Sequence, residues 1–156
     1  MKKWVPLALF VLTLTLSWAL SPWWNPWQYS LSALGSSSNG IGGAIFNGGL
    51  ALTSYTISKL KMSSFQNIIQ IIAILTALVA AINIDFGIAH FLVATLLFLA
   101  LYTYVLLHGD VVAYVGTASS LGLWLSHWTL GVPPGIALPE LSAIALAFLY
   151  LLRDIK

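Results

Sequence analysis

Six long apolar segments constrain this chain more than any motif does. Each has 17 to 22 residues and is bounded by a helix breaker or a charge. At a rise of about 1.5 Å per residue, a helix of this length comes close to the roughly 30 Å hydrocarbon core of a bilayer. Helices are expected because an isolated strand cannot satisfy its backbone in lipid, and the sequence lacks the alternating segments of a β-barrel. The predicted spans are residues 4–20, 41–58, 67–84, 86–107, 111–130 and 136–152.

Composition supports the same class of protein. Of the 156 residues, 60% are hydrophobic and 6% are charged, and the mean hydropathy is +0.95. Ordinary soluble domains carry about 25% charged residues. A soluble enzyme, a nucleic-acid-binding module and a disordered tail are therefore excluded, and no nucleic-acid partner is expected. We predict one all-α domain over residues 1–156, a six-transmembrane-helix bundle that crosses the cell membrane several times.

The basic residues predict how the chain is threaded. They precede the first span, separate the second from the third and follow the sixth, so six spans place all of them on one side. The positive-inside rule assigns that side to the cytoplasm, together with both termini. Five spans would break this agreement. The residues are Lys2, Lys3, Lys59, Lys61, Arg153 and Lys156.

The first outer connection carries the signals of a short helix. Asn25 is placed as an N-cap, Pro26 suits the first helical position and Gln28 sits where a capping-box partner belongs. Gly35 is a natural stop. We therefore expect an interfacial helix that lies flat on the outer surface of the membrane. Its apolar face would hold Trp27, Leu31 and Leu34.

Small residues recur along the second and fifth spans. Gly40, Ala44 and Gly48 follow each other at intervals of four, and Gly116 and Ser120 belong to a similar stripe. Such stripes are typical of close helix contacts. They predict either packing inside the bundle or an interface between chains.

Five polar side chains are predicted to lie at one depth, in the outer leaflet. Such residues are rare in spans and usually face the bundle interior, so we interpret them as a candidate ligand-binding pocket. Structural roles remain open for each: a helix cap, hydrogen bonds to backbone, or contact with free N–H groups at a helix start. The five are Asn47, Asp85, His90, His127 and Glu140.

The sequence His108-Gly109-Asp110, predicted to lie on the cytoplasmic side, is explained by helix ends and caps without a catalytic role. His108 ends the fourth helix, Gly109 suits the position after it, and Asp110 can cap the fifth helix. The absence of Cys excludes disulfides and thiolate catalysis. No nucleotide-binding, zinc-protease or serine-hydrolase motif is present.

Two stretches resemble a known family. Residues 25–35 contain Ser-x-Leu-Gly at 32–35, and residues 46–50 read Phe-Asn-x-Gly-Leu, while His90 opens the fourth span. In these features the chain resembles the DUF998 family, small polytopic membrane proteins of archaea and bacteria. The resemblance covers roughly residues 20–105. It implies a six-helix membrane fold and no particular function.

Three hypotheses of function follow. In the first, the outer pocket binds a small ligand or a lipid headgroup, or processes lipids with a zinc ion held by His90, His127 and Glu140. In the second, the chain is a non-catalytic subunit of a membrane complex or of a homo-oligomer. In the third, His90 and His127 are axial ligands of a b-type haem. The sequence leaves open whether the protein is an enzyme and which cofactor it holds.

Overall fold

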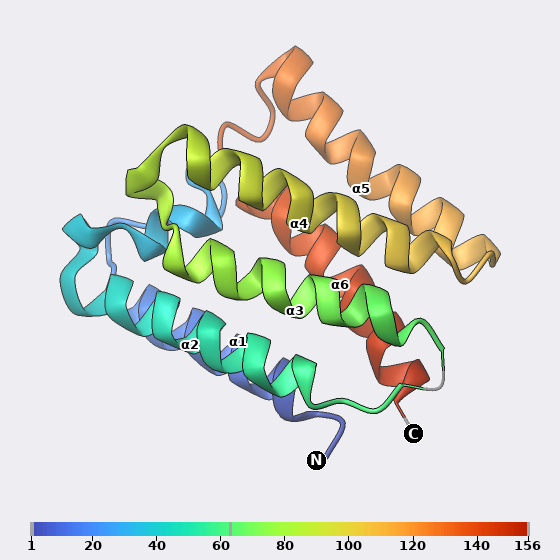
Figure 1. Cartoon of the computed structure of the whole chain (residues 1–156). Helices are drawn as coiled ribbons and strands as arrows, with labels where there is room; N and C mark the ends of the chain where they lie inside the picture. Colours follow the sequence, from blue (N-terminus) through green and yellow to red (C-terminus); the bar gives the residue numbers. More distant parts are fainter. Residues whose placement is uncertain (1, 63, 156) are drawn as a thin grey trace.

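Each apolar segment forms one α helix in the computed structural model, which describes residues 2–62 and 64–155 (Figure 1). The all-α prediction is confirmed, and that part of the chain contains no strand. The bounds lie within three residues of the predicted ones. The helices are α1 (Val5–Ala19), α2 (Gly40–Ser58), α3 (Gln66–Ala81), α4 (Ile88–Leu106), α5 (Val111–Leu130) and α6 (Ala137–Asp154). Three short 3₁₀ helices join them: η1 (Leu31–Gly35), η2 (Ser37–Asn39) and η3 (Ile84–Phe86).

One of these helices is long and apolar enough to cross a membrane, within the described residues. It is α4, with 19 residues and a mean hydropathy of 2.0. Helices α1 and α3 are apolar but shorter, at 15 and 16 residues.

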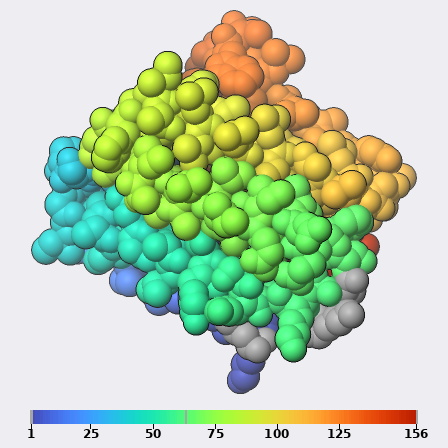
Figure 2. Space-filling view, in the orientation of Figure 1, coloured from blue at the N-terminus to red at the C-terminus, as the bar shows by residue number. Residues whose placement is uncertain are grey.

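The helices pack in chain order from α1 to α4, and α6 then returns to complete the bundle. The rings of Phe10 and Phe148, tilted toward each other with centroids 5.8 Å apart, join α1 to α6. Helix α5 packs against α4 and α6 at the edge of the bundle (Figure 1). In the same orientation, the side chains of α2, α3 and α4 together cover one face of the molecule (Figure 2).

The bundle has two distinct ends. Both termini lie at one end, with residues 59–62, 64–65 and 107–110, and we call it the termini end (Figure 1). A backbone bridge between Met62 and Ile155 and an ion pair between Asp110 and Arg153 tie these segments together. The connections 20–39, 82–87 and 131–136 form the opposite end, which we call the clamp end.

The predicted interfacial helix is shorter and starts later than expected. Asn25 does cap a turn, because its Oδ1 accepts the N–H groups of Trp27 and Gln28. The turn stops at Ser30, whose backbone is extended and whose hydroxyl accepts the N–H of Ala33 to start η1. A serine that bonds its own backbone in this way competes with helix continuation. Leu31 and Leu34 are buried, as a single apolar face requires, while Trp27 is exposed.

The glycines of α2 that make close contacts are not those of the predicted stripe. A Cβ at Gly48 would meet nothing within 4 Å, whereas one at Gly49 would overlap Thr13 of α1. A Cβ at Gly43 would overlap the carbonyl group of Ser36. The face of α2 that packs closely is therefore rotated from the one that the spacing Gly40, Ala44 and Gly48 predicts. In α5 the predicted stripe does face inward, since Ser120 is buried.

Candidate functional site

Glu140 holds the beginning of η1. It lies in the first turn of α6 and is only 4% exposed. Its Oε2 accepts a hydrogen bond from the backbone N–H of Leu31 at 2.6 Å. The two residues are 109 positions apart in the chain, so this bond fixes the connection 20–39 to α6.

His90 holds the next residue of η1. It lies in the first turn of α4 and is 6% exposed. Its Nε2 is 2.8 Å from Oγ of Ser32, and its Nδ1 is 2.6 Å from the carbonyl oxygen of Ile82. Both ring nitrogens are thus engaged.

Asn47 and Asp85 hold the end of the same segment. Asn47 of α2 donates through Nδ2 to the carbonyl oxygen of Gly35 at 2.8 Å. Asp85 of η3 accepts from the Ser36 hydroxyl at 2.8 Å and from the Ser37 N–H at 2.7 Å. The Ser37 N–H first, and then the Ser37 and Ser36 hydroxyls, lower the pKa of Asp85 below its ordinary value.

Four of the five predicted pocket residues therefore surround residues 31–37. They come from four different elements, and each bonds to a different part of the segment. Short 3₁₀ helices such as η1 and η2 leave backbone groups unpaired at their ends, and these must find partners elsewhere. We call this arrangement the clamp. It consists of residues 31–37 together with Asn47, Asp85, His90 and Glu140.

His127 lies outside the clamp. It is in the last turn of α5, and its Nδ1 is 2.8 Å from the carbonyl oxygen of Pro133. It ties the end of α5 to the connection that follows. Its neighbour Ser126 donates to the carbonyl oxygen of Val132 in the same connection.

The predicted metal ligands do not gather. Within residues 2–62 and 64–155, no group of three or more His, Cys, Asp or Glu side chains could hold a metal ion. For a haem, His90 would have to give up its bond to Ser32 or to Ile82 before either ring nitrogen could bind iron.

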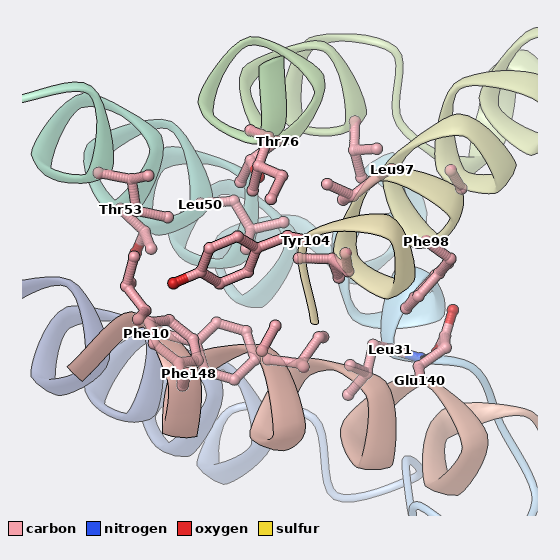
Figure 3. Close-up of a pocket in the computed structure, with 18 of the residues that line it drawn as sticks. Phe10, Leu31, Leu50, Thr53, Thr76, Leu97, Phe98, Tyr104, Glu140 and Phe148 are labelled. Atoms are coloured by element: carbon pink, nitrogen blue, oxygen red, sulfur yellow. Dashed lines mark hydrogen bonds between the residues drawn. The ribbon is translucent and has the colours of Figure 1, made fainter. Parts of the chain in front are cut away.

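Below the clamp lies an apolar cavity of about 100 Å³ (Figure 3). By the same measure, roughly 10 to 15 Å³ holds one water molecule, and apolar cavities stay dry or bind apolar molecules. Leu31, Ser32 and Glu140 line one end, and Tyr104 and Leu151 line the other. The 11 residues from Glu140 to Leu151 span about 16 Å of α6, so the lining extends along more than half of that helix.

The termini end carries a second polar cluster. The Asp154 carboxylate accepts from the hydroxyl of Tyr104 at 2.8 Å and lies 2.8 Å from Nε2 of His108. Asp110 caps α5 as predicted, through the N–H of Ala113.

Asp110 also ties α5 to α6. It accepts from the hydroxyl of Tyr150 and forms the ion pair with Arg153. The Tyr150 hydroxyl first, and then the Ala113 N–H, lower the pKa of Asp110 below its ordinary value.

Sequence reasoning assigned no chemistry to Ser32, although this residue opens the Ser-x-Leu-Gly stretch. Ser32 differs from the other described serines by its bond to a histidine 58 positions away in the chain, and no local sequence pattern reveals such a pair. Tyr104 and Tyr150 were missed for the same reason, because each bonds an aspartate on another element.

Comparisons with known proteins add nothing to this geometry. No family model matches the chain, and no curated protein or solved structure matches it significantly.

Proposed function

We propose that the protein is a multi-pass integral membrane protein whose six α helices all cross the bilayer, and that its interior binds a lipophilic, chain-like molecule. The apolar cavity below the clamp carries the second part of this proposal. The DUF998 resemblance agrees with the first part and stays a prediction.

The outward faces of the helices support a bilayer environment. On α4, Ile88 is 77% exposed and Phe91 is 64% exposed, and leucines extend this face along the helix. Exposed apolar side chains also cover α1, α3 and α5. Soluble monomers rarely expose contiguous apolar patches larger than a few hundred Å², so lipid is the natural solvent for such a surface. The 15-residue α1, about 22 Å long, would need the bilayer to thin or its flanking residues to reach the interface.

Charge supports one orientation. Lys2, Lys3, Lys59, Lys61 and Arg153 all belong to segments of the termini end. The connections at the clamp end contain no Lys or Arg. By the positive-inside rule the termini end faces the cytoplasm and the clamp faces outward.

The cavity supports a chain-like ligand. Its walls are almost entirely apolar and come from α1, α2, α3, α4, α6 and η1. Five polar side chains also line it: Ser32, Thr53, Thr76, Tyr104 and Glu140. The hydroxyls of Thr53 and Thr76 donate to backbone carbonyl groups of their own helices. An acyl or isoprenoid chain suits this lining, because it buries apolar surface without stranding polar groups.

A photoreactive probe tests the ligand. A long-chain fatty acid with a diazirine near the chain terminus should crosslink the purified protein, and mapping should place the adducts on cavity-lining peptides. Ala94→Phe should abolish the crosslinks because Ala94 lines the cavity and the ring would fill it. Ala89→Phe is the control, since Ala89 lies on the same helix but is exposed. Equal labelling of both variants would reject the cavity as the site.

The threading can be tested separately, because the chain contains no native Cys. Single cysteines would replace the exposed residues Ser38 at the clamp end and Lys61 at the termini end. A membrane-impermeant maleimide should label Ser38→Cys in intact cells and should label Lys61→Cys only after lysis. The opposite pattern would reverse the proposed orientation, and labelling of both in intact cells would reject the span assignment.

A further inference from the structure

The bonds of His90 define which of its nitrogens carries the proton. The carbonyl oxygen of Ile82 can only accept, so the Nδ1 facing it at 2.6 Å must carry the hydrogen. In a neutral imidazole the other nitrogen then has a free lone pair. Nε2 therefore accepts, and the hydroxyl of Ser32 is the donor in their 2.8 Å bond.

This arrangement is the one that activates a serine. A nucleophilic hydroxyl needs a base within hydrogen-bond reach, and the base needs a third group that orients it. Ser32, His90 and the Ile82 carbonyl supply these three parts. Among the described residues, no other serine hydroxyl bonds a histidine. Ser17 and Ser54, for example, donate to backbone carbonyl groups.

The position of Ser32 indicates which class of substrate could reach its hydroxyl. Ser32 lines the end of the apolar cavity, while His90 lies behind it at the start of α4. An acyl chain lying in the cavity would thus end beside a serine whose proton already points at a base. Glu140 would act as a positioning residue, because its bond to the N–H of Leu31 fixes the residue just before Ser32.

We propose that Ser32 and His90 form a catalytic dyad that hydrolyses an ester of a long-chain carboxylic acid. This proposal rests on the proposed chain-binding cavity. Oγ of Ser32 attacks the ester carbonyl carbon while its proton moves to Nε2 of His90. The intermediate collapses, the C–O bond to the alcohol breaks, and His90 returns the proton to the departing alkoxide.

Water completes the cycle. It attacks the acyl-Ser32 ester, and Nε2 of His90 takes one of its protons. Collapse of the second intermediate breaks the bond between Oγ and the acyl carbon, and His90 returns the proton to Oγ of Ser32. The products are a long-chain acid and an alcohol, with no change in oxidation state.

An alkyl fluorophosphonate tests the dyad on the full-length protein in detergent micelles. Fluorophosphonates modify activated serines, so a dodecyl probe should form one adduct that peptide mapping places on Ser32. This measurement needs no variant that might fail to fold. An unmodified protein, or an adduct at a different serine, would overturn the proposal.

Variants separate catalysis from a purely structural bond. His90→Gln can keep a hydrogen bond to Ser32 but cannot serve as the base, and the rate of labelling should fall about 100-fold. Ser119→Ala, at an exposed serine of α5 outside the clamp and the cavity, should leave the rate unchanged. Labelling of His90→Gln at the wild-type rate would show that the bond only holds η1 in place.

Probe length distinguishes the failure of the dyad from the failure of the cavity. Crosslinking of the diazirine fatty acid without any Ser32 adduct would leave the binding function and reject the dyad. Equal modification of Ser32 by ethyl and dodecyl probes would leave the dyad and reject the cavity as its chain-binding site. The expected result is faster modification by the dodecyl probe, with the advantage lost in Ala94→Phe.

Discussion

The two ends of the bundle use polar side chains in opposite ways. At the clamp end, Asn47, Asp85 and Glu140 bond backbone groups of residues 31–37. At the termini end, Asp110 bonds the side chains of Tyr150 and Arg153. Asp154 bonds those of Tyr104 and His108. The clamp thus fixes the conformation of the short segment 31–37. The cluster at the termini end instead joins α helices whose conformation is already fixed by their own backbone hydrogen bonds. Loss of one clamp bond should therefore free a local segment, and loss of one bond at the other end should not.

The largest loss of stability is expected from Gly135→Val, which disrupts the packing of the connection 131–136 against the connection 20–39. Gly135 packs against the connection 20–39, and its N–H donates to the carbonyl oxygen of Trp27 at 2.8 Å. A Cβ there would overlap the backbone of Gln28 and Tyr29, which cannot move aside as a side chain could. We expect a loss of about 3 kcal/mol or more in the free energy of unfolding, measured by denaturation in micelles.

Gly122→Ala is the matched control for that substitution. A Cβ at Gly122 in α5 would meet nothing within 4 Å. Because Ala is the better helix former, stability should stay the same or rise by about 0.5 to 1 kcal/mol. Similar losses in both variants would contradict the tight contact between the connections 20–39 and 131–136.

A pair of substitutions compares the two ends directly. Glu140→Ala removes the acceptor of the buried Leu31 N–H, which should cost about 1 to 3 kcal/mol. Tyr104→Phe removes one donor to Asp154, which keeps His108 nearby, and should cost about 1 kcal/mol. Hydrogen exchange should accelerate at residues 31–35 in the first variant only.

Glu140→Gln refines that comparison, because its side-chain carbonyl can still accept from Leu31. Its exchange rates at residues 31–35 should lie between those of the wild type and of Glu140→Ala. Accelerated exchange at residues 31–35 in Tyr104→Phe would mean that the two ends are coupled, against the division proposed here.

The smallest effect concerns the pH dependence of the clamp. The pKa of Asp85 is lowered in the folded state, so its bonds stabilise the protein above the ordinary aspartate pKa of about 4. That stabilisation is lost as the pH falls through the lower, folded-state pKa. The wild type should lose slightly more thermal stability than Asp85→Asn between about pH 7 and pH 3, since an exposed carboxylate contributes little. The effect is absent if the two proteins change in parallel.

Local signals in the sequence predicted the helices well. The apolar segments matched the helices closely because length and hydropathy are properties of each segment alone. The cap at Asp110 was confirmed for the same reason, since its partner is the N–H three residues later. The cap at Asn25 also formed, but one competing serine ended its helix after a single turn.

The partners of the polar side chains could not be predicted. Their common depth followed from their positions in the spans, but their contacts depend on how each helix is rotated and on the path of residues 31–37. The bond between Glu140 and Leu31 joins α6 to the connection 20–39, and the bond between His90 and Ser32 crosses 58 positions. A single sequence contains no signal for such pairs. Whether the five residues form a ligand pocket stays a prediction.

The contact between the connections 20–39 and 131–136 limits how a lipophilic molecule could reach the cavity. Besides the bond from Gly135, the N–H of Ala137 donates to the carbonyl oxygen of Tyr29 at 3.0 Å, so both connections and the start of α6 are joined. Together with the clamp they form one hydrogen-bonded layer, the roof, that covers the cavity at this end of the bundle. A ligand would not have to pass through that roof if it slid sideways between two helices from the surrounding lipid. On that route its chain would never leave a hydrocarbon environment, and water would be kept away until the head of the molecule reached the roof.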